Sequence, residues 1–325
     1  MTQEEAFYAD IHPKLIEWAQ EALNCDIDKT EIAHSSLYSY CLKISVKTGD
    51  FFLKHESPIF FKEAQVLRIL NKAPNRVYVP RLIKINSGLN AFIMARAGDE
   101  TLRSCFEKNG FCPDKMTRGL RNYIAIQKQS YGLMDQLHPL EIPDWRLEKI
   151  PLMYRDFISD THIMKVWGID DQTRHKLETI CPRIEKAASR LEALTPGIRN
   201  VLNNSDFSDN NITIDVESGD CYTIDWAETH IGHPFLSLRF CLWGLADRYG
   251  LPVTSKDYQA LKREMLNGYS VRAQDADEIY NLTTLLAPVY FVLSFQDLMQ
   301  KSGFDYPNWA GKNRAALLTL IERVD

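Results

Sequence analysis

The first third of the chain alternates between two spacings of apolar side chains. Residues 38–47 alternate apolar and polar side chains, and residues 51–54 resume an extended run after a Lys-Thr-Gly-Asp turn, which predicts a β-hairpin. Apolar residues at helical spacing over 13–23 and 59–71 predict two amphipathic helices. Further extended runs lie at 77–79, 81–85 and 91–95.

A break in both patterns follows at residues 97–100 and looks like a connection between lobes. Beyond it the spacing is mostly helical, interrupted by one predicted hairpin with strands at 212–215 and 222–225. A chain of 325 residues is also too long for one simple core. We therefore expect an α+β fold with a small β-rich lobe over 1–96 and a larger helical lobe over 97–325. The helices expected in the second lobe are 101–108, 115–137, 147–158, 171–194, 234–249, 255–268, 273–300 and 310–324.

Composition restricts the partners and the compartment. The net charge of −5 argues against general nucleic-acid binding, because no excess of Lys and Arg is available for phosphates. No run of about 18 apolar residues is present, so no membrane association is expected. The seven cysteines are odd in number and widely spaced, which is typical of reduced thiols rather than of disulfides or zinc ligands. We expect a cytoplasmic protein that is a monomer or a homodimer.

Three polar residues around the second predicted hairpin have the chemistry that phosphoryl transfer requires. Asp206 can orient an attacking hydroxyl and accept its proton. Asn211 and Asp225 offer amide and carboxylate oxygens, which are ligands that suit Mg²⁺ on nucleotide phosphates. Asp and Asn also favour turns and caps, so each residue alone has an ordinary structural explanation. The three together favour a phosphotransfer site.

Two charged residues upstream complete this hypothesis. Lys54 ends a predicted strand, where a lysine can reach the α- and β-phosphates of a nucleotide. Glu63 lies on the next predicted helix, where its carboxylate can orient that lysine. Taken singly, each is more simply explained as a solvated surface charge. Their order along the chain, a strand lysine followed by a helix glutamate, favours the nucleotide site.

These residues resemble the motifs of the aminoglycoside phosphotransferase-like (phosphotransferase enzyme) family. That family carries H-x-D-x-x-x-x-N and a later I-D-W, which resemble residues 204–211 and 224–226 here, and the run at 232–238 is also similar. The resemblance covers roughly residues 35–245. It implies a protein-kinase-like two-lobed fold that binds ATP or GTP with Mg²⁺. The roles it implies are Asp206 as catalytic base, Asn211 and Asp225 as Mg²⁺ ligands, and Lys54 paired with Glu63.

The resemblance also implies two nucleotide-contacting segments and leaves two departures. A hinge around residues 92–97, with Phe92, Met94 and Arg96, is expected to meet the base of the nucleotide. Residues 33–37 stand where many kinases have a glycine-rich loop, and the turn with Ser35 and Ser36 is expected to cradle phosphate through its backbone amides. That turn has no glycine. Asn204 stands where the family has histidine, and we expect it to hold the loop by hydrogen bonds to backbone groups.

The leading functional hypothesis is a small-molecule kinase that phosphorylates a hydroxyl of a metabolite or an aminoglycoside-like acceptor. The alternative is a nucleotide-binding pseudokinase that acts as a regulatory or interaction module, favoured by Asn204 and by the glycine-free turn. A protein substrate ranks below both, because residues 225–234 leave no long activation segment.

Two loop carboxylates are candidates for contact with the acceptor. Asp209 can bind a cationic acceptor, or it is a solvated loop charge, and the second reading is favoured. Glu228 can contact the acceptor or a metal-bound water, or it caps a turn. No pattern in the helical lobe names the acceptor.

Overall fold

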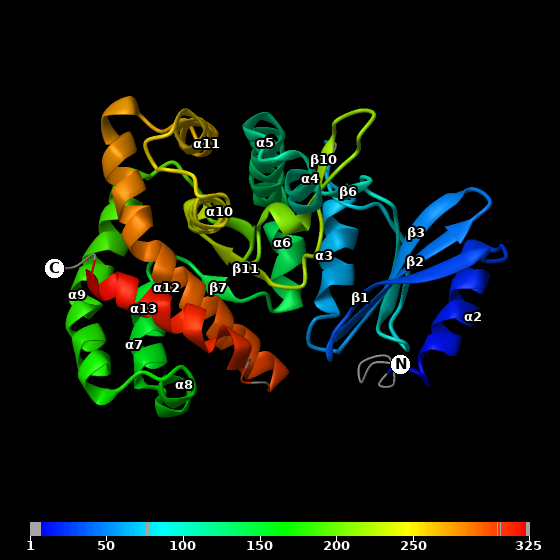
Figure 1. Cartoon of the computed structure of the whole chain (residues 1–325), viewed down its shortest axis with the longest axis horizontal. Helices are drawn as coiled ribbons and strands as arrows, with labels where there is room; N and C mark the ends of the chain where they lie inside the picture. Colours follow the sequence, from blue (N-terminus) through cyan, green and yellow to red (C-terminus); the bar gives the residue numbers. More distant parts are fainter. Residues whose placement is uncertain (1–7, 76–77, 304, 306, 323–325) are drawn as a thin grey trace.

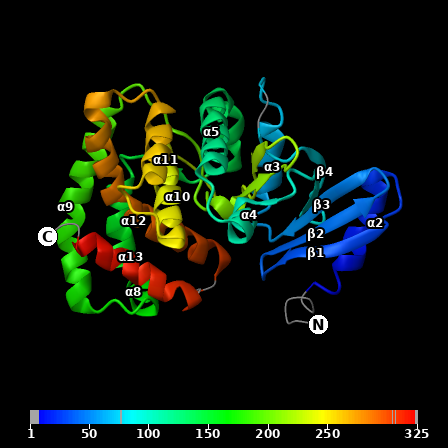
Figure 2. The ribbon, with the colours of Figure 1, turned by 45° about the horizontal axis from the view of Figure 1, so that its top comes forward.

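The chain forms a β-rich lobe and a helical lobe side by side, and the computed structural model describes residues 8–75, 78–303, 305 and 307–322 (Figure 1). A turned view shows the same two parts, with the N-terminal sheet on one side and the long C-terminal helices on the other (Figure 2). This arrangement confirms the expected α+β, two-lobed fold.

The first lobe is built on a five-stranded antiparallel sheet in the order β1-β2-β3-β5-β4. The side chains of β5 point alternately to its two faces: Ala91 and Ile93 join one apolar cluster, whereas Phe92 and Met94 join the other. The strands are β1 Lys29–Ser35, β2 Ser39–Val46, β3 Gly49–Glu56, β4 Leu82–Asn86 and β5 Ala91–Ala95.

One helix packs on each face of this sheet. Helix α2, His12–Leu23, buries Leu15 and Ala19 in the cluster on the outer face. Helix α3, Lys62–Leu70, buries Ala64 and Leu67 on the inner face, which is turned toward the second lobe. The alternation of β3 therefore directs Lys54 toward α3 rather than toward α2.

In this lobe one strand was missed and one expected strand is not present in the described residues. Strand β1 was not predicted, because most of its side chains are exposed and it carries no alternating apolar pattern. A strand was expected at 77–79, but residues 78 and 79 are not in a strand, and residue 77 lies outside the described residues.

The second lobe consists mainly of helices. Helices α9 and α10 have the bounds that the apolar spacing predicted, and most of the others differ by a few residues at their ends. The longer helices are α4 Leu102–Asn109, α5 Pro113–Gln129, α7 Ile150–Ser159, α9 Asp171–Leu194, α10 Pro234–Tyr249, α11 Lys256–Asn267, α12 Ala276–Ser302 and α13 Ala310–Glu322. Shorter ones are α6 Met134–Leu137, α8 Thr161–Val166, η1 Ser130–Leu133, η2 His138–Leu140, η3 Asp209–Asn211, η4 Ala273–Asp275 and η5 Pro307–Trp309.

The single helix expected over 115–137 is interrupted at Ser130. The Ser130 hydroxyl donates to the carbonyl oxygen of Gln127 (2.6 Å) and accepts from the backbone N–H of Leu202 (2.9 Å). The chain turns into the 3₁₀ segment η1 at this buried serine. A long-range contact, which apolar spacing cannot reveal, therefore divides the helix.

Helix α12 buries many apolar side chains along its length. The stretch Ala273–Ser302 is long and apolar enough to cross a membrane by length and composition alone, yet 67% of its most apolar window is buried inside the protein. Such burial is typical of the central helix of a helical lobe.

Two small sheets lie in and beside the helical lobe and hold the loops of the site. One has the order β10-β9-β6, with β9 Ile212–Ile214, β10 Cys221–Thr223 and β6 Glu100–Thr101. The other has the order β7-β11-β8, with β7 Asp144–Trp145, β11 Thr229–Gly232 and β8 Val201–Asn204. Strand β8 ends directly before the loop that carries Asp206.

A glycine marks the connection between the two lobes. Gly98 has a φ of +77°, and a Cβ atom there would lie 2.9 Å from backbone atoms of Ile214. The next residue, Asp99, donates its backbone N–H to the carbonyl oxygen of Ile214 (2.7 Å). Only glycine permits this close approach of the connection to the second predicted hairpin.

Candidate active site

The loop between β8 and β9 is held by two asparagines. Asn211 Nδ2 donates to Asp206 Oδ2 (2.7 Å) and to the carbonyl oxygen of Asp206 (3.0 Å). Asn204 Oδ1 accepts from the backbone N–H of Asp206 (2.9 Å), and Asn204 Nδ2 donates to the carbonyl oxygen of Asp225 (2.7 Å). Asn204 thus joins the Asp206 loop to the segment that carries Asp225, by the backbone hydrogen bonds expected of it.

Asp225 is placed by an unusual backbone conformation. Its φ is +60°, in the left-handed region that costs energy for a residue with a side chain. Three contacts hold the segment: the Asn204 bond to the Asp225 carbonyl, an ion pair of Asp225 Oδ1 with Lys54 Nζ (2.7 Å), and donation from the Trp226 N–H to Glu63 Oε1 (3.0 Å). This conformation leaves the Asp225 side chain 46% exposed toward the cleft.

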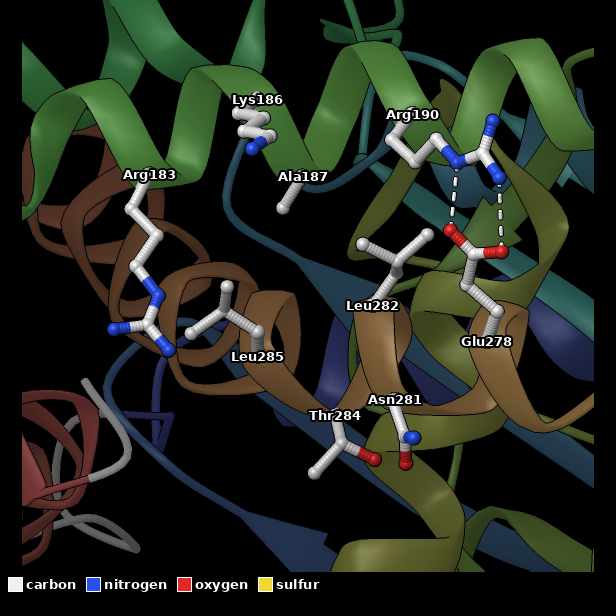
Figure 3. A pocket seen from close by; sticks show the side chains of 9 residues that line it. All are labelled: Arg183, Lys186, Ala187, Arg190, Glu278, Asn281, Leu282, Thr284 and Leu285. Atoms are coloured by element: carbon white, nitrogen blue, oxygen red, sulfur yellow. Dashed lines mark hydrogen bonds and ion pairs between the residues drawn. The ribbon is translucent and has the colours of Figure 1, made fainter. Parts of the chain in front are cut away.

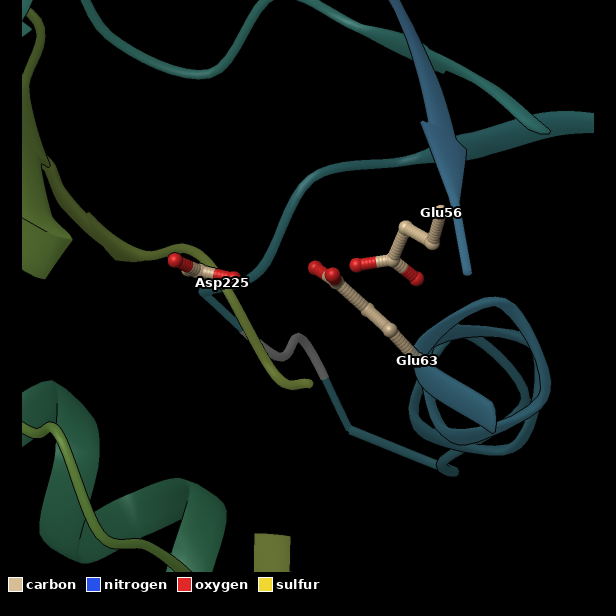
Figure 4. Close-up of side chains that lie close together, drawn as sticks. All are labelled: Glu56, Glu63 and Asp225. Carbon is tan, nitrogen blue, oxygen red and sulfur yellow. The ribbon is translucent and has the colours of Figure 1, made fainter. Parts of the chain in front are cut away.

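Lys54 lies among three carboxylates. Its Nζ is 2.5 Å from Glu63 Oε2, 2.7 Å from Asp225 Oδ1 and 3.0 Å from Glu56 Oε1. Figure 4 shows Glu56, Glu63 and Asp225 directed toward one another from β3, α3 and the segment after β10. The expected pairing of Lys54 with Glu63 is therefore present, and it extends to the second lobe through Asp225.

Burial and neighbouring charge set the protonation of this cluster. Burial opposes the charge of Lys54, but Asp225, Glu56 and Glu63 outweigh it and raise the pKa of Lys54 well above its usual value. Burial, together with the charge of Glu63, raises the pKa of Glu56 well above its usual value despite Lys54. The three carboxyl groups thus stabilise the cation on Lys54, while burial favours the protonated form of Glu56.

Glu56 was not identified from the sequence. Its side chain is 1% exposed, and it lies two residues after Lys54 on β3. Residues two apart on a strand share a face. The alternation of β3 therefore contains a signal that could have identified Glu56 as a neighbour of Lys54.

Two carboxyl groups that line the cleft have raised pKa values. Burial and the nearby charge of Asp225 raise the pKa of Asp206 to about 7, against the hydrogen bond from Asn211. Burial and the charges of Asp206 and Asp225 raise the pKa of Glu228 to about 8, against a hydrogen bond from the Ser205 hydroxyl. A carboxylate with a pKa near neutrality can exchange a proton at physiological pH.

These groups line one cleft of about 620 Å³ between the lobes. Its lining includes Met94 from the expected hinge, and the backbone of Ala95, Ala97 and Gly98 continues it. The sequence-derived site residues that line the cleft are Lys54, Glu63, Met94, Asp206, Asn211, Asp225 and Glu228.

Other expected nucleotide contacts lie outside the lining. Phe92 is fully buried in the core, and Arg96 pairs with Asp99 (2.5 Å) at the connection between the lobes. Ser35 and Ser36 are also absent from the lining, which instead takes Ala33 and His34 from β1. The lining of the cleft therefore does not include Phe92, Arg96, Ser35 or Ser36, and contact of these residues with a nucleotide stays a prediction.

The glycine-free turn between β1 and β2 is fixed by hydrogen bonds. The Tyr8 hydroxyl donates to the Ser36 carbonyl oxygen (2.6 Å), and Ser36 Oγ accepts from the Ser39 N–H (3.2 Å). The Tyr8 ring also stacks on Tyr40, with ring centroids 4.5 Å apart. The segment before α2 thus supports the turn from outside the sheet.

Asp209 is neither a solvated loop charge nor a group open to the cleft. Its side chain is buried, Oδ1 accepts from Arg103 Nη2 (2.8 Å), and Oδ2 accepts from the Tyr249 hydroxyl. These partners come from α4 and α10. The carboxylate is engaged in fixing the loop to the helical lobe, so we assign it no contact with an acceptor.

A groove between α9 and α12 is larger than the cleft but separate from it. It encloses about 880 Å³, and Arg190 on α9 forms ion pairs with Glu278 on α12 across it (Figure 3). Its lining shares no residue with the cleft that contains Asp206. The residues expected to carry out the chemistry, such as Lys54, Asp206 and Asp225, therefore line the smaller cleft and not the groove.

Replacing Asn204 with alanine is expected to lower the free energy of unfolding by about 2 kcal/mol, because it leaves the Asp206 N–H and the Asp225 carbonyl without their buried partner. Urea unfolding measures the change. Asn210→Ala, at an exposed position of the same loop, is the control and should have little effect. Equal stability of the two variants would contradict the bridging role of Asn204.

Comparison with known proteins supports the fold. No protein-family model and no curated protein sequence matches the chain. Among solved structures, an ethanolamine kinase of Plasmodium vivax has a TM-score of 0.61 at 14% identity, over 98% of this chain and 89% of that chain. A complex of APH(2")-IIia with GDP and kanamycin has a TM-score of 0.64 at 14% identity, over 97% and 98%.

A third solved structure is similar to the same extent. An aminoglycoside phosphotransferase, APH(4)-Ia, in complex with AMP-PNP and hygromycin B has a TM-score of 0.58 at 14% identity, over 95% of this chain and 98% of that chain. At this identity the similarity establishes the fold alone. The chain has the protein-kinase-like fold found in small-molecule kinases.

Proposed function

We propose that the chain is a small-molecule kinase that transfers the γ-phosphoryl group of ATP or GTP to a hydroxyl of a small acceptor with the help of Mg²⁺. The observation that carries this proposal is the meeting of two sets of residues in one cleft. Lys54, Glu63 and Asp225 form one ion-paired set, and Asp206 with Asn211 forms the other. Phosphoryl transfer needs both a phosphate-binding cation and a carboxylate for the hydroxyl.

The residues around Asp225 fit a Mg²⁺ ion by their chemistry. Asp225 supplies a carboxylate that is 46% exposed to the cleft, and Asn211 retains its amide oxygen because only Nδ2 is used on Asp206. Both are hard oxygen donors of the kind that Mg²⁺ prefers. When bound, Mg²⁺ would neutralise charge on the nucleotide phosphates. We assign Asn211 and Asp225 as its protein ligands.

In the proposed reaction Asp206 is the catalytic base. It orients the acceptor hydroxyl and accepts its proton, while Asn211 Nδ2 holds the Asp206 carboxylate in place. A new bond forms between the acceptor oxygen and the γ-phosphorus as the bond from that phosphorus to the β,γ-bridging oxygen breaks. The products are a nucleoside diphosphate and a phosphate monoester, and the proton passes from Asp206 to solvent.

Other parts of the cleft have supporting roles in this proposal. Lys54, oriented by Glu63, binds the nucleotide phosphates, and Glu56 places a third carboxyl group beside Lys54. The hinge from Met94 to Ala97 receives the base, and the lobes divide at residues 96 and 97.

We place the protein in a reducing compartment such as the cytoplasm, since its seven cysteines are all free.

A thermal-shift experiment tests nucleotide binding. Mg²⁺ with ATP or GTP should raise the melting temperature by mass action, and Asp225→Asn should remove the increase. Asp215→Asn, at the turn of the same hairpin, should retain it. No increase with either nucleotide would overturn the proposal. Release of ADP or GDP with a set of hydroxylated metabolites then measures turnover, and binding without turnover would favour a regulatory nucleotide-binding module instead.

A further inference from the structure

A second, smaller pocket adjoins the cleft at Asp206. It encloses about 210 Å³, and it shares Asp206, Glu228 and Tyr38 with the lining of the cleft. The rest of its lining comes from the helical lobe, from Ser205 after β8 and from α10, α12 and η5. A molecule in this pocket can therefore approach Asp206 from the side of the helical lobe, while the cleft remains available to a nucleotide.

Aromatic rings form a continuous row along this pocket. Phe240 stacks on Phe291 with centroids 5.6 Å apart, Phe291 meets Phe295 edge to face at 5.0 Å, and Phe295 lies 5.0 Å from Trp309. Lys312 Nζ lies 4.4 Å from the centroid of Trp309, so this ring already attracts a cation. Faces of such rings bind alkylated ammonium groups through their quadrupoles.

The charge of the pocket also favours a cation. Its lining contains the carboxyl groups of Asp206 and Glu228, and no basic side chain is among the described residues that line it. Lys62, which interacts with the charge of Glu228, lies close to Lys301, and Lys301 is paired with Asp297. The lining itself therefore offers carboxyl groups and, among the described residues, no competing cation.

The volume limits the size of the ligand. Sites for drug-sized ligands enclose roughly 300–1,000 Å³, and this pocket is smaller. A polycyclic aminosugar with several ammonium groups would exceed it and would place hydrated cations against phenylalanine rings. A compact molecule with one alkylated ammonium and one hydroxyl fits both the volume and the lining.

We infer that the pocket is the acceptor site and that it takes a small amino alcohol with an alkylated ammonium group. This inference rests on the proposed function. The ammonium lies against the row Phe291, Phe295 and Trp309, and the hydroxyl reaches Asp206. The γ-phosphoryl group then moves from the nucleotide to that hydroxyl oxygen, and the hydroxyl proton moves to Asp206.

Direct binding to the full chain, measured by calorimetry with AMP-PNP and Mg²⁺ present, tests the inference without any turnover. The probes are choline, its neutral isostere 3,3-dimethylbutan-1-ol, and kanamycin. Choline should bind about tenfold or more tightly than the neutral isostere, because only choline gains the attraction between cation and ring. Equal binding of the two, tighter binding of kanamycin, or no binding of choline would each overturn the inference.

Two variants locate the bound choline. Phe295→Leu keeps an apolar side chain but removes the ring, and it should weaken choline about fivefold while leaving the weak binding of the isostere unchanged. Phe111→Leu, at a partly buried phenylalanine outside both linings, should change neither. Equal affinities of both variants for choline would overturn the placement. If AMP-PNP does not bind but choline does, the result would count against the proposed kinase activity and would still support the choline site.

Discussion

Asp206→Asn should abolish phosphoryl transfer and at the same time raise the melting temperature of the protein at about pH 8. Asparagine has nearly the shape of aspartate and can still accept from Asn211 Nδ2, so the loop should keep its conformation. It cannot take a proton from the acceptor hydroxyl. A loss in kcat of about 10²- to 10⁴-fold is expected, with nucleotide binding largely retained because Lys54 and Met94 are untouched.

The gain in stability follows from the raised pKa of Asp206. Burial and the charge of Asp225 raise that pKa from 3.8 to about 7 in the folded protein. Between these values the folded state binds more protons than the unfolded state, so the stability contributed by this group falls as pH rises. The asparagine variant lacks this loss. The stability of Asp206→Asn relative to the wild type should therefore show no gain below about pH 4, increase up to about pH 7 and then stay constant.

Melting temperature against pH and ADP release at saturating nucleotide measure the two effects. Asp215→Asn is the matched control, because the backbone N–H of Ser218 lowers the pKa of Asp215 rather than raising it. That variant should keep full turnover and should gain no stability at high pH. Wild-type turnover in Asp206→Asn would rule out Asp206 as the base, and a melting temperature below that of the wild type at high pH would contradict the raised pKa of Asp206.

The sequence predicted the residues of the cleft better than the strands that hold them. Lys54, Glu63, Asp206 and Asp225 were expected together because their chemical types and order match one reaction, and the structure brings them into one cleft. Strand β8 was missed because its sequence, Val-Leu-Asn-Asn, has no alternation and all four residues are buried. Its asparagines also depend on partners distant in sequence, such as Gln127 for Asn203 and Asp225 for Asn204.

The proposed acceptor pocket shows a second reason why parts of the site could not be predicted from the sequence. Phe291 and Phe295 are four residues apart on α12. The same spacing occurs wherever one face of a helix packs against another helix, so it does not identify a ligand site. Their neighbours Phe240 and Trp309 lie on other elements, so the row exists only after α10, α12 and η5 have packed. The role of Asp209 was not predicted for the same reason. Its hydrogen-bond donors, Arg103 and Tyr249, are far from it in the chain.

Lys54→Met should destabilise the fold and abolish nucleotide binding together. Lys54 is the cation for Glu63 and Asp225, and its side chain is only 9% exposed. Removing one partner from a buried ion pair leaves uncompensated charge and costs about 3–5 kcal/mol. Urea unfolding should show this decrease, and calorimetry with Mg²⁺ and ATP should show no binding. Lys43→Met, which breaks the more exposed pair with Asp50 (2.9 Å), should cost about 1 kcal/mol or less.

A double variant separates the structural contribution of Lys54 from its role toward nucleotide. In Lys54→Met/Glu63→Gln the second change removes one of the stranded carboxylate charges, and the glutamine oxygen can still accept from the Trp226 N–H. Much of the lost free energy of unfolding should return. Nucleotide binding should not return, because the cation for the phosphates is still missing. Recovery of both would mean that Lys54 acts only as a structural ion, and recovery of neither would mean that Glu63 is not the group that Lys54 stabilises.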